Sequence, residues 1–257
     1  MWLIALLILI LVCLLVPAAF KKRIPTVQNV NQGLVVFDDF IEPSARQAPL
    51  SYQGTSFTGA VLAGAASVDQ TVAYGDRNYP GAVAIAVNTS NDQVSFASPV
   101  VLTLDHSTFL DTQTRFFLSG LINNVTHTFG FSDALGDRGS EGDAAVIYFN
   151  KNTSNNYVCY AKSSDTGTST QVITTVPGSI STDTYFRILV TPNFIYYYIN
   201  SVLVATINLS LNPAVHLGCG WGVEVGGAIT PVTMVVDAIS ITQQFDTPRT
   251  FVNPASQ

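Results

Sequence analysis

An uncharged apolar run at the N-terminus constrains this chain more than any other feature of its sequence. No charged residue occurs between Trp2 and Phe20. As an α-helix, this stretch would extend for about 28 Å, close to the thickness of the hydrocarbon core of a bilayer. The sequence therefore predicts a transmembrane anchor over residues 1–23. Its apolar surface includes Trp2, Leu7, Leu11, Leu15 and Phe20, and the basic residues Lys21, Lys22 and Arg23 end it at the lipid headgroups.

A cleaved signal peptide is the alternative interpretation of the same run. Val16-Pro17-Ala18 offers small residues at a cleavage spacing, but no basic residue precedes the apolar run, which is also longer than a usual signal sequence. We therefore expect the anchor to be retained. The basic cluster on its C-terminal side places the head of the protein on the cytoplasmic side of the membrane, because positive charge favours that side.

Four Asn-x-Ser/Thr sites would fit a lumenal location instead; they are Asn88, Asn124, Asn152 and Asn208. In a chain so rich in Asn, Ser and Thr, about three such sites arise by chance. The charge signal therefore decides the expected orientation, and we predict a single-pass membrane protein with a cytoplasmic head.

The composition after the anchor indicates one β-rich domain with a weakly charged, acidic surface. Charged residues make up 11% of the chain, against roughly 25% in an average soluble protein. Three of the 11 basic residues end the anchor, so the head keeps 8 against 17 acidic residues, a net charge of −9. Such a head would repel phosphate backbones, which excludes nucleic acid as an expected partner.

Short runs rich in Val, Ile, Thr, Phe and Tyr, bounded by Gly, Asn, Asp or Pro, predict β-strands through the head. They cover residues 34–37, 82–87, 100–104, 115–122, 126–131, 144–149, 157–161, 171–176, 185–190, 194–199, 202–207, 217–225 and 233–241. We expect a linker over 24–33, a β-sandwich domain over 34–245 and an extended tail over 246–257. Cys159 and Cys219 have apolar or aromatic neighbours, which favours buried free thiols over a disulfide.

The strands at 185–190, 194–199 and 202–207 form a predicted three-stranded meander, because Thr191-Pro192-Asn193 and Asn200-Ser201 are turn sequences. Both faces of the middle strand are largely apolar or aromatic, so we expect that strand inside its sheet and not at an edge. Aromatic side chains of lectins stack on sugar rings, and the candidates for such a role here are Tyr196, Tyr197, Tyr198 and Trp221. Core packing is the more frequent role of aromatic residues in strands.

Four segments follow one another along the head: Thr128-Phe129-Gly130-Phe131-Ser132-Asp133, Ala145-Val146-Ile147-Tyr148-Phe149, the end of the meander at Ile199-Asn200-Ser201-Val202-Leu203-Val204, and Val235-Val236-Asp237-Ala238-Ile239-Ser240-Ile241. Together they resemble the concanavalin A-like lectin/glucanase jelly-roll superfamily. This resemblance covers roughly residues 34–245 and implies a two-sheet antiparallel jelly-roll sandwich. The expected fold is therefore all-β, preceded by one transmembrane helix.

The glucanases of that superfamily carry a Glu-x-Asp-x-(x)-Glu strand for a retaining mechanism. Glu141 and Asp143 match its first two acids, but Ala or Val occupies the position of the acid/base, so we expect no glucanase activity and a solvated loop. The acidic residues Asp133, Asp137, Glu141 and Asp143 are weak candidates for a calcium site, although their spacing fits no EF-hand. A triad around His106 is not expected, because its neighbour Asp105 would point to the opposite face of a strand.

These observations predict a non-enzymatic structural protein without a cofactor, anchored in a membrane. Its layout is similar to that of membrane-anchored minor capsid proteins of large icosahedral DNA viruses. The expected role is therefore a virion component that links an internal membrane to a protein shell, with the lipid bilayer and other capsid proteins as partners. The alternative is a lectin-like surface protein that binds glycans, at residues that the sequence leaves unidentified.

Overall fold

The computed structural model describes residues 28–30, 33–38, 58–70, 82–98, 102–105, 107–120, 123–135, 140–180 and 182–246. Within these residues, no helix is long and apolar enough to cross a membrane. The predicted anchor, with Trp2, Leu7, Leu11, Leu15 and Phe20, and the basic cluster Lys21, Lys22 and Arg23 lie outside the described residues.

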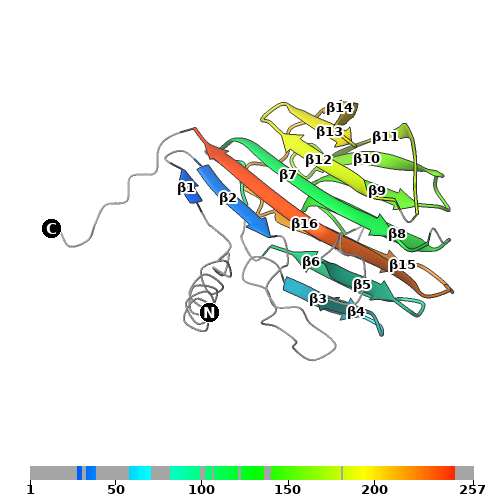
Figure 1. Ribbon diagram of the computed structural model, residues 1–257. Coiled ribbons are helices and arrows are strands. Elements are labelled where there is room, and N and C mark those ends of the chain that lie inside the picture. Colours follow the sequence, from blue (N-terminus) through cyan, green and yellow to red (C-terminus); the bar gives the residue numbers. More distant parts are fainter. Residues whose placement is uncertain are drawn as a thin grey trace, which may run out of the picture.

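Within the described ranges, sheet 1 has nine antiparallel strands, and the two longest, β7 and β16, run side by side at its centre (Figure 1). Its main path contains β1 (Gln28–Val30), β2 (Gly33–Asp38), β16 (Val232–Phe245), β7 (Ser107–Leu118), β12 (Thr184–Val190), β13 (Phe194–Ile199) and β14 (Val202–Asn208). β5 (Val83–Val87) pairs with β16 next to β2, and β4 (Ser67–Gln70) pairs with β5.

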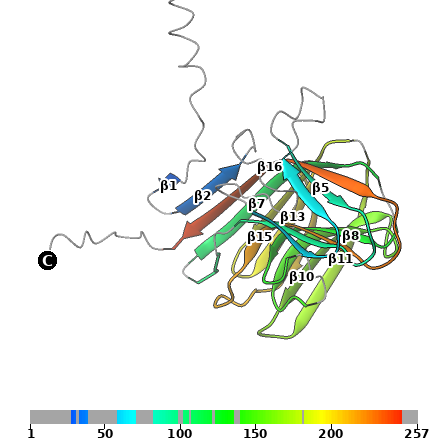
Figure 2. The same ribbon diagram turned by 90° about the horizontal axis from the view of Figure 1, so that it is seen from below.

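Sheet 2, as far as the structure describes the chain, has seven antiparallel strands and lies against sheet 1 as the second layer (Figure 2). Its order is β11 (Thr168–Pro177), β10 (Asn156–Ser163), β9 (Ala144–Asn150), β8 (Val125–Ser132), β15 (Gly218–Val225), β6 (Gln93–Ala97) and β3 (Thr58–Ala63). The predicted all-β fold with two antiparallel sheets is therefore confirmed. The meander is also found at β12–β13–β14, with β13 paired on both sides.

The prediction of a strand over residues 100–104 is wrong for the part that the structure describes. Only Leu102 pairs, in an isolated bridge with Leu217. The next residues form a turn in which the Ser107 amide donates to the Leu104 carbonyl at 3.1 Å, and this turn leads directly into β7. β7 consequently begins eight residues before the predicted strand at 115–122. A short strand, β1, lies within the expected linker and pairs with β2.

Aromatic rings from both sheets fill the centre of the core. Phe116 and Phe186 of sheet 1 have ring centroids 4.7 Å apart, and Phe116 lies 4.6 Å from Trp221 of sheet 2. Phe129 of sheet 2 lies 5.1 Å from the same Trp221 ring. These rings are almost fully buried, and such tilted contacts add about 0.5–1.5 kcal/mol per pair beyond the area that they bury.

Cys159 and Cys219 are both free and buried, which confirms the expectation of unpaired thiols. Cys219 Sγ donates to Thr112 Oγ1 at 3.1 Å. Burial raises the pKa of each thiol to about 12, because the apolar surroundings disfavour the thiolate. Only the thiolate is an efficient nucleophile, so both groups are unreactive in the folded protein.

We predict that neither thiol reacts with a disulfide reagent such as dithiobis(nitrobenzoate) at pH 8 until the protein unfolds. The measurement uses a Cys13→Ser background and follows the released chromophore before and after addition of urea. Rapid labelling of the folded protein would contradict the buried placement of Cys159 and Cys219.

His127 in β8 is a buried imidazole that can be charged only at a cost in stability. Within the described part of the chain its Nδ1 has no hydrogen-bond partner, and desolvation lowers its pKa from 6.5 to about 4. Above pH 6.5 the imidazole is neutral in both the folded and the unfolded chain. As the pH falls from 6.5 towards 4, the unfolded chain takes up the proton first, so folding stability is lost over that window.

We predict that His127→Gln reduces the loss of stability between pH 7.5 and pH 5 by about 2 kcal/mol. Urea unfolding of both proteins at the two pH values measures this difference. His216, which is exposed, offers the control variant His216→Gln, which should leave the pH dependence unchanged. An equal pH dependence in wild type and His127→Gln would show that this buried imidazole is not responsible.

Candidate functional site

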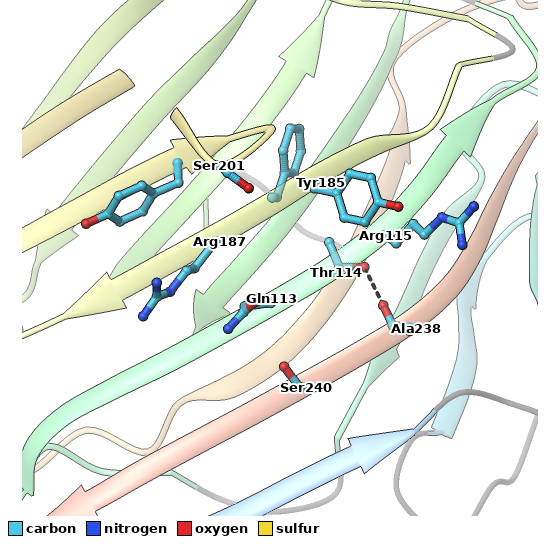
Figure 3. Close-up of a pocket in the computed structure, with 10 residues that line it drawn as sticks. Gln113, Thr114, Arg115, Tyr185, Arg187, Ser201, Ala238 and Ser240 are labelled. Carbon is cyan, nitrogen blue, oxygen red and sulfur yellow. Dashed lines mark hydrogen bonds between the residues drawn. The ribbon is translucent and has the colours of Figure 1, made fainter. Parts of the chain in front are cut away.

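The outward face of sheet 1 carries a hollow of about 440 Å³, which we call the groove. It crosses four strands, and Figure 3 shows its labelled side chains on neighbouring ribbons. Ten residues line it: Gln113, Thr114, Arg115, Tyr185, Phe186, Arg187, Tyr198, Ser201, Ala238 and Ser240.

Strand alternation explains why polar and aromatic side chains gather on this face. In β7 every second residue from Leu110 to Leu118 is buried, which turns Asp111, Gln113 and Arg115 outward. The pairing register then places Arg187 of β12 directly between Gln113 of β7 and Tyr198 of β13. Four strands therefore present one mixed surface.

The first of two ion pairs in the groove joins β12 to β7. Arg187 Nε donates to Asp111 Oδ1 at 3.0 Å, and Arg187 Nη2 donates to Asp111 Oδ2 at 2.8 Å, a bidentate arrangement. The hydrogen bond to Asp111 raises the pKa of the Arg187 guanidinium above its usual value. The same guanidinium lies 5.4 Å from the centroid of the Tyr198 ring, within the range of a cation–π contact.

The second ion pair involves Arg115, whose guanidinium is held by two carboxylates. Arg115 Nη1 donates to Asp237 Oδ2 at 3.0 Å, and its Nε donates to Asp183 Oδ2 at 3.2 Å. This guanidinium lies 5.7 Å from the centroid of the Tyr185 ring, which is 47% exposed. The groove thus contains two tyrosine rings, each next to a guanidinium that is fixed in position.

The chemistry of this surface suits a ligand with flat apolar faces and many hydroxyl groups. Tyrosine rings and stacked guanidinium planes provide flat contact surfaces. The Gln113 amide and the Ser240 and Ser201 hydroxyls can each donate and accept hydrogen bonds. Gln113 lies directly opposite Ser240 in the pairing of β7 with β16.

Among the aromatic residues that the sequence singled out, only Tyr198 lines the groove. Tyr197 and Trp221 are buried in the core, where Tyr197 OH donates to the Tyr160 carbonyl at 2.7 Å and Trp221 Nε1 donates to Thr114 Oγ1 at 3.3 Å. Tyr196 is on the outward face of β13 but is not among the lining residues. Asp111, Arg115 and Arg187 were not predicted as site residues. Arg187 lies between the apolar residues Phe186 and Ile188, which is a visible signal, whereas residues 111–115 are polar throughout.

The expectation that Glu141 and Asp143 lie in a solvated loop is wrong, because both residues are buried. Asp143 Oδ1 accepts from the Asn212 amide at 2.8 Å, and Asp143 Oδ2 accepts from the Ser164 amide at 3.2 Å. Asp133 in turn accepts from the amides of Gly142 and Asp143. The carboxylates of Asp133 and Asp143 therefore join loops at one end of sheet 2.

These carboxylates are used as acceptors for backbone amides, and no group of three or more side chains that could hold a metal ion occurs within the described ranges. Asp137, the fourth calcium candidate, lies outside the described residues, as does His106. Asp133 and Asp143 are linked by the hydrogen bond from the Asp143 amide to the Asp133 carboxylate, and the contacts described for both carboxylates organise the loops.

Comparison with known proteins identifies the fold, whereas no family model and no curated protein matches the sequence. A protein of unknown function from Shewanella oneidensis MR-1 has 14% identity and a TM-score of 0.63, over 88% of this chain and 93% of that one. The carbohydrate recognition domain of Emp47p has 10% identity and a TM-score of 0.57, over 84% and 96%. The Crh5 transglycosylase, solved in complex with NAG, has 16% identity and a TM-score of 0.54, over 87% and 90%.

These neighbours have concanavalin A-like lectin or glycosidase folds, and the chain shares their two-sheet jelly-roll sandwich, the fold that the resemblance of its sequence motifs implied. The same structures correct the prediction that the protein is not an enzyme. Crh5 shows that a transglycosylase uses this fold, as does a glycoside hydrolase family protein from Mycobacterium thermorestibile. The missing third acid after Asp143 argues against one arrangement of catalytic residues and not against catalysis by the fold.

We predict that Asp143→Ala lowers the free energy of unfolding by about 2–4 kcal/mol, because the Ser164 and Asn212 amides lose their acceptor. Urea unfolding measures the change. Asp165 is an exposed acid on the neighbouring β10–β11 turn, and Asp165→Ala should change stability by less than about 0.5 kcal/mol. Equal effects of the two substitutions would contradict the role given to Asp143.

Proposed function

We propose that this protein binds glycans and that the groove on sheet 1 is its binding surface. The observation that carries the proposal is the pair of tyrosine rings, Tyr185 and Tyr198, each beside a guanidinium that carboxylates hold in place. Sugar rings present flat C–H faces that pack on aromatic rings, and their hydroxyls match the amide and hydroxyl groups of the groove. The fold supports this proposal, since a carbohydrate recognition domain and a transglycosylase share it.

The rigidity of the site also supports recognition of a specific ligand. Its side chains come from paired strands, and bidentate or shared ion pairs restrict the rotamers of Arg187 and Arg115. A binding surface that is ordered before the ligand arrives loses less conformational entropy on binding. An extended oligosaccharide fits the open shape of the groove better than a small compact metabolite.

A membrane-tethered virion component remains the second prediction from the sequence. Its evidence is the apolar run over residues 1–23, which lies outside the described residues. The two ideas are compatible, because a tethered head is also able to bind glycans. The groove is the feature of the described residues that favours the glycan-binding role.

The test compares two tyrosines that lie two residues apart on the outward face of β13. We predict that Tyr198→Ala weakens binding of an oligosaccharide, identified on a glycan array, by about ten- to thirtyfold, the equivalent of about 1.4–2 kcal/mol. Tyr196→Ala removes a similar ring outside the groove and should leave the dissociation constant unchanged.

Calorimetric titration of the full chain in detergent gives the dissociation constants, and analysis of the sugar after incubation reports any cleavage or transfer. Tyr198→Phe keeps the ring and should retain most of the affinity. Absence of binding to every oligosaccharide on the array, or equal losses in Tyr196→Ala and Tyr198→Ala, would contradict the proposal.

A further inference from the structure

The two guanidinium groups of the groove are already engaged by carboxylates of the protein. Arg187 uses Nε and Nη2 for its bidentate contact with Asp111. Arg115 donates from Nε and Nη2 to Asp183 and from Nη1 to Asp237. A guanidinium in a bidentate pair cannot offer the same fork to a second anion without breaking the first contact.

The charge of this surface is also unfavourable for an anion. Among the described residues that form these two networks, Arg115 and Arg187 carry two positive charges, and Asp111, Asp183 and Asp237 carry three negative ones. The charges of these five residues sum to −1, and the head as a whole has a net charge of −9. To gain a bidentate contact, a sulfated or uronate sugar would have to displace a carboxylate, and it would also approach a surface of its own sign.

An uncharged sugar meets neither obstacle. Its hydroxyls can donate to the outer lone pairs of the carboxylates and accept from Gln113 or from the remaining N–H groups of Arg187. Its ring can pack on Tyr198 while the ion pair stays intact, because the guanidinium contacts the tyrosine ring and the carboxylate at the same time.

Removal of Asp111 would release a guanidinium, whereas removal of either of the other two carboxylates would not. Asp111 forms the ion pair with Arg187, whose side chain is 42% exposed. The Arg115 side chain is 26% exposed and forms ion pairs with two carboxylates. Loss of Asp183 or Asp237 alone would leave Arg115 paired. Loss of Asp111 would release the bidentate fork of Arg187 on the open surface of the groove.

We infer that Asp111 is the specificity-determining residue of the groove: by holding Arg187, it sets the site for uncharged glycans and against anionic ones. This inference rests on the proposed glycan-binding function. It predicts that the wild-type protein prefers the neutral member of any matched pair of sugars, and that Asp111→Asn relaxes this preference.

The experiment uses a glycan array on which each neutral N-acetylglucosamine-containing oligosaccharide is printed beside its sulfated counterpart, followed by calorimetric titration of the best pair. Wild type should bind the neutral member at least about tenfold more tightly, the equivalent of about 1.4 kcal/mol. Asp111→Asn should bind the sulfated member about tenfold more tightly than wild type does, so the ratio of neutral to sulfated affinity should fall about tenfold or more.

The matched control is Asp165→Asn, which removes one negative charge from an exposed turn outside the groove. It changes the net charge of the protein by the same amount and should leave both affinities unchanged. A second measurement needs no variant. Binding of the neutral sugar to wild type should be insensitive to salt between about 50 mM and about 500 mM, because no charge on the ligand is screened.

The outcomes separate this inference from the proposed function. If wild type prefers the sulfated sugars, or if Asp111→Asn and Asp165→Asn change sulfated-sugar affinity equally, Asp111 does not set specificity, although the groove still binds glycans. If neither form of any sugar binds, the proposed function itself is wrong. If Asp111→Asn does not fold, as judged by its unfolding midpoint, the wild-type preference and its salt dependence decide alone.

Discussion

Two threonines at the centre of the core determine how the two sheets fit together. Thr112 and Thr114 are inward-facing residues of β7, and their hydroxyls donate to the carbonyls of Ser240 and Ala238 in β16 at 3.0 Å. The same hydroxyl oxygens accept hydrogen bonds from Cys219 and Trp221 of sheet 2. A buried hydroxyl without partners costs about 1–3 kcal/mol. A shift of β7 against β16 by one residue would leave both threonines unsatisfied and turn them outward.

The register that these threonines stabilise also positions the groove on the opposite face of sheet 1. Phe116 pairs with Val236 and Arg115 pairs with Ala238, so Asp237 is the extra residue of a β-bulge in β16. This bulge brings the Asp237 carboxylate to the Arg115 guanidinium at 3.0 Å. Figure 3 shows this link, because its dashed line is the hydrogen bond between Thr114 and Ala238, two residues that line the groove. The geometry of the groove is thus a consequence of the core.

The sequence predicts the strands whose patterns are local and misses those that depend on distant partners. The meander was predictable because apolar runs alternate with turn residues within one continuous segment. β6 alternates over only five residues, and residues 111–115 of β7 are polar throughout, because threonines occupy the buried positions 112 and 114. Such runs become strands through the sheet that buries one of their faces. The class of fold followed from motifs, but strand order required the structure.

The candidate site was less predictable than the fold, for a related reason. Asp111 and Arg187 are 76 residues apart in the sequence, and Asp237 lies beyond both. Their contacts depend on the register of three strand pairs and on one bulge, none of which periodicity specifies. Glu141 and Asp143 show the converse error. Their acidic, glycine-rich surroundings are typical of solvated loops, yet hydrogen bonds from Ser164 and Asn212 hold Asp143 in the interior.

The two faces of sheet 1 have different roles: the inward face packs in the core, and the outward face carries the ion pairs of the groove. Partly exposed ion pairs such as Arg187–Asp111 contribute at most about 1 kcal/mol to folding, because solvent screens them and ordering two long side chains costs entropy. The buried aromatic cluster and the hydrogen-bonded threonines stabilise the sandwich, and these contacts do not involve the ion pairs of the groove. Substitutions in the groove are therefore able to change recognition while the fold persists. Such independence lets one sandwich carry different ligand specificities on the same scaffold.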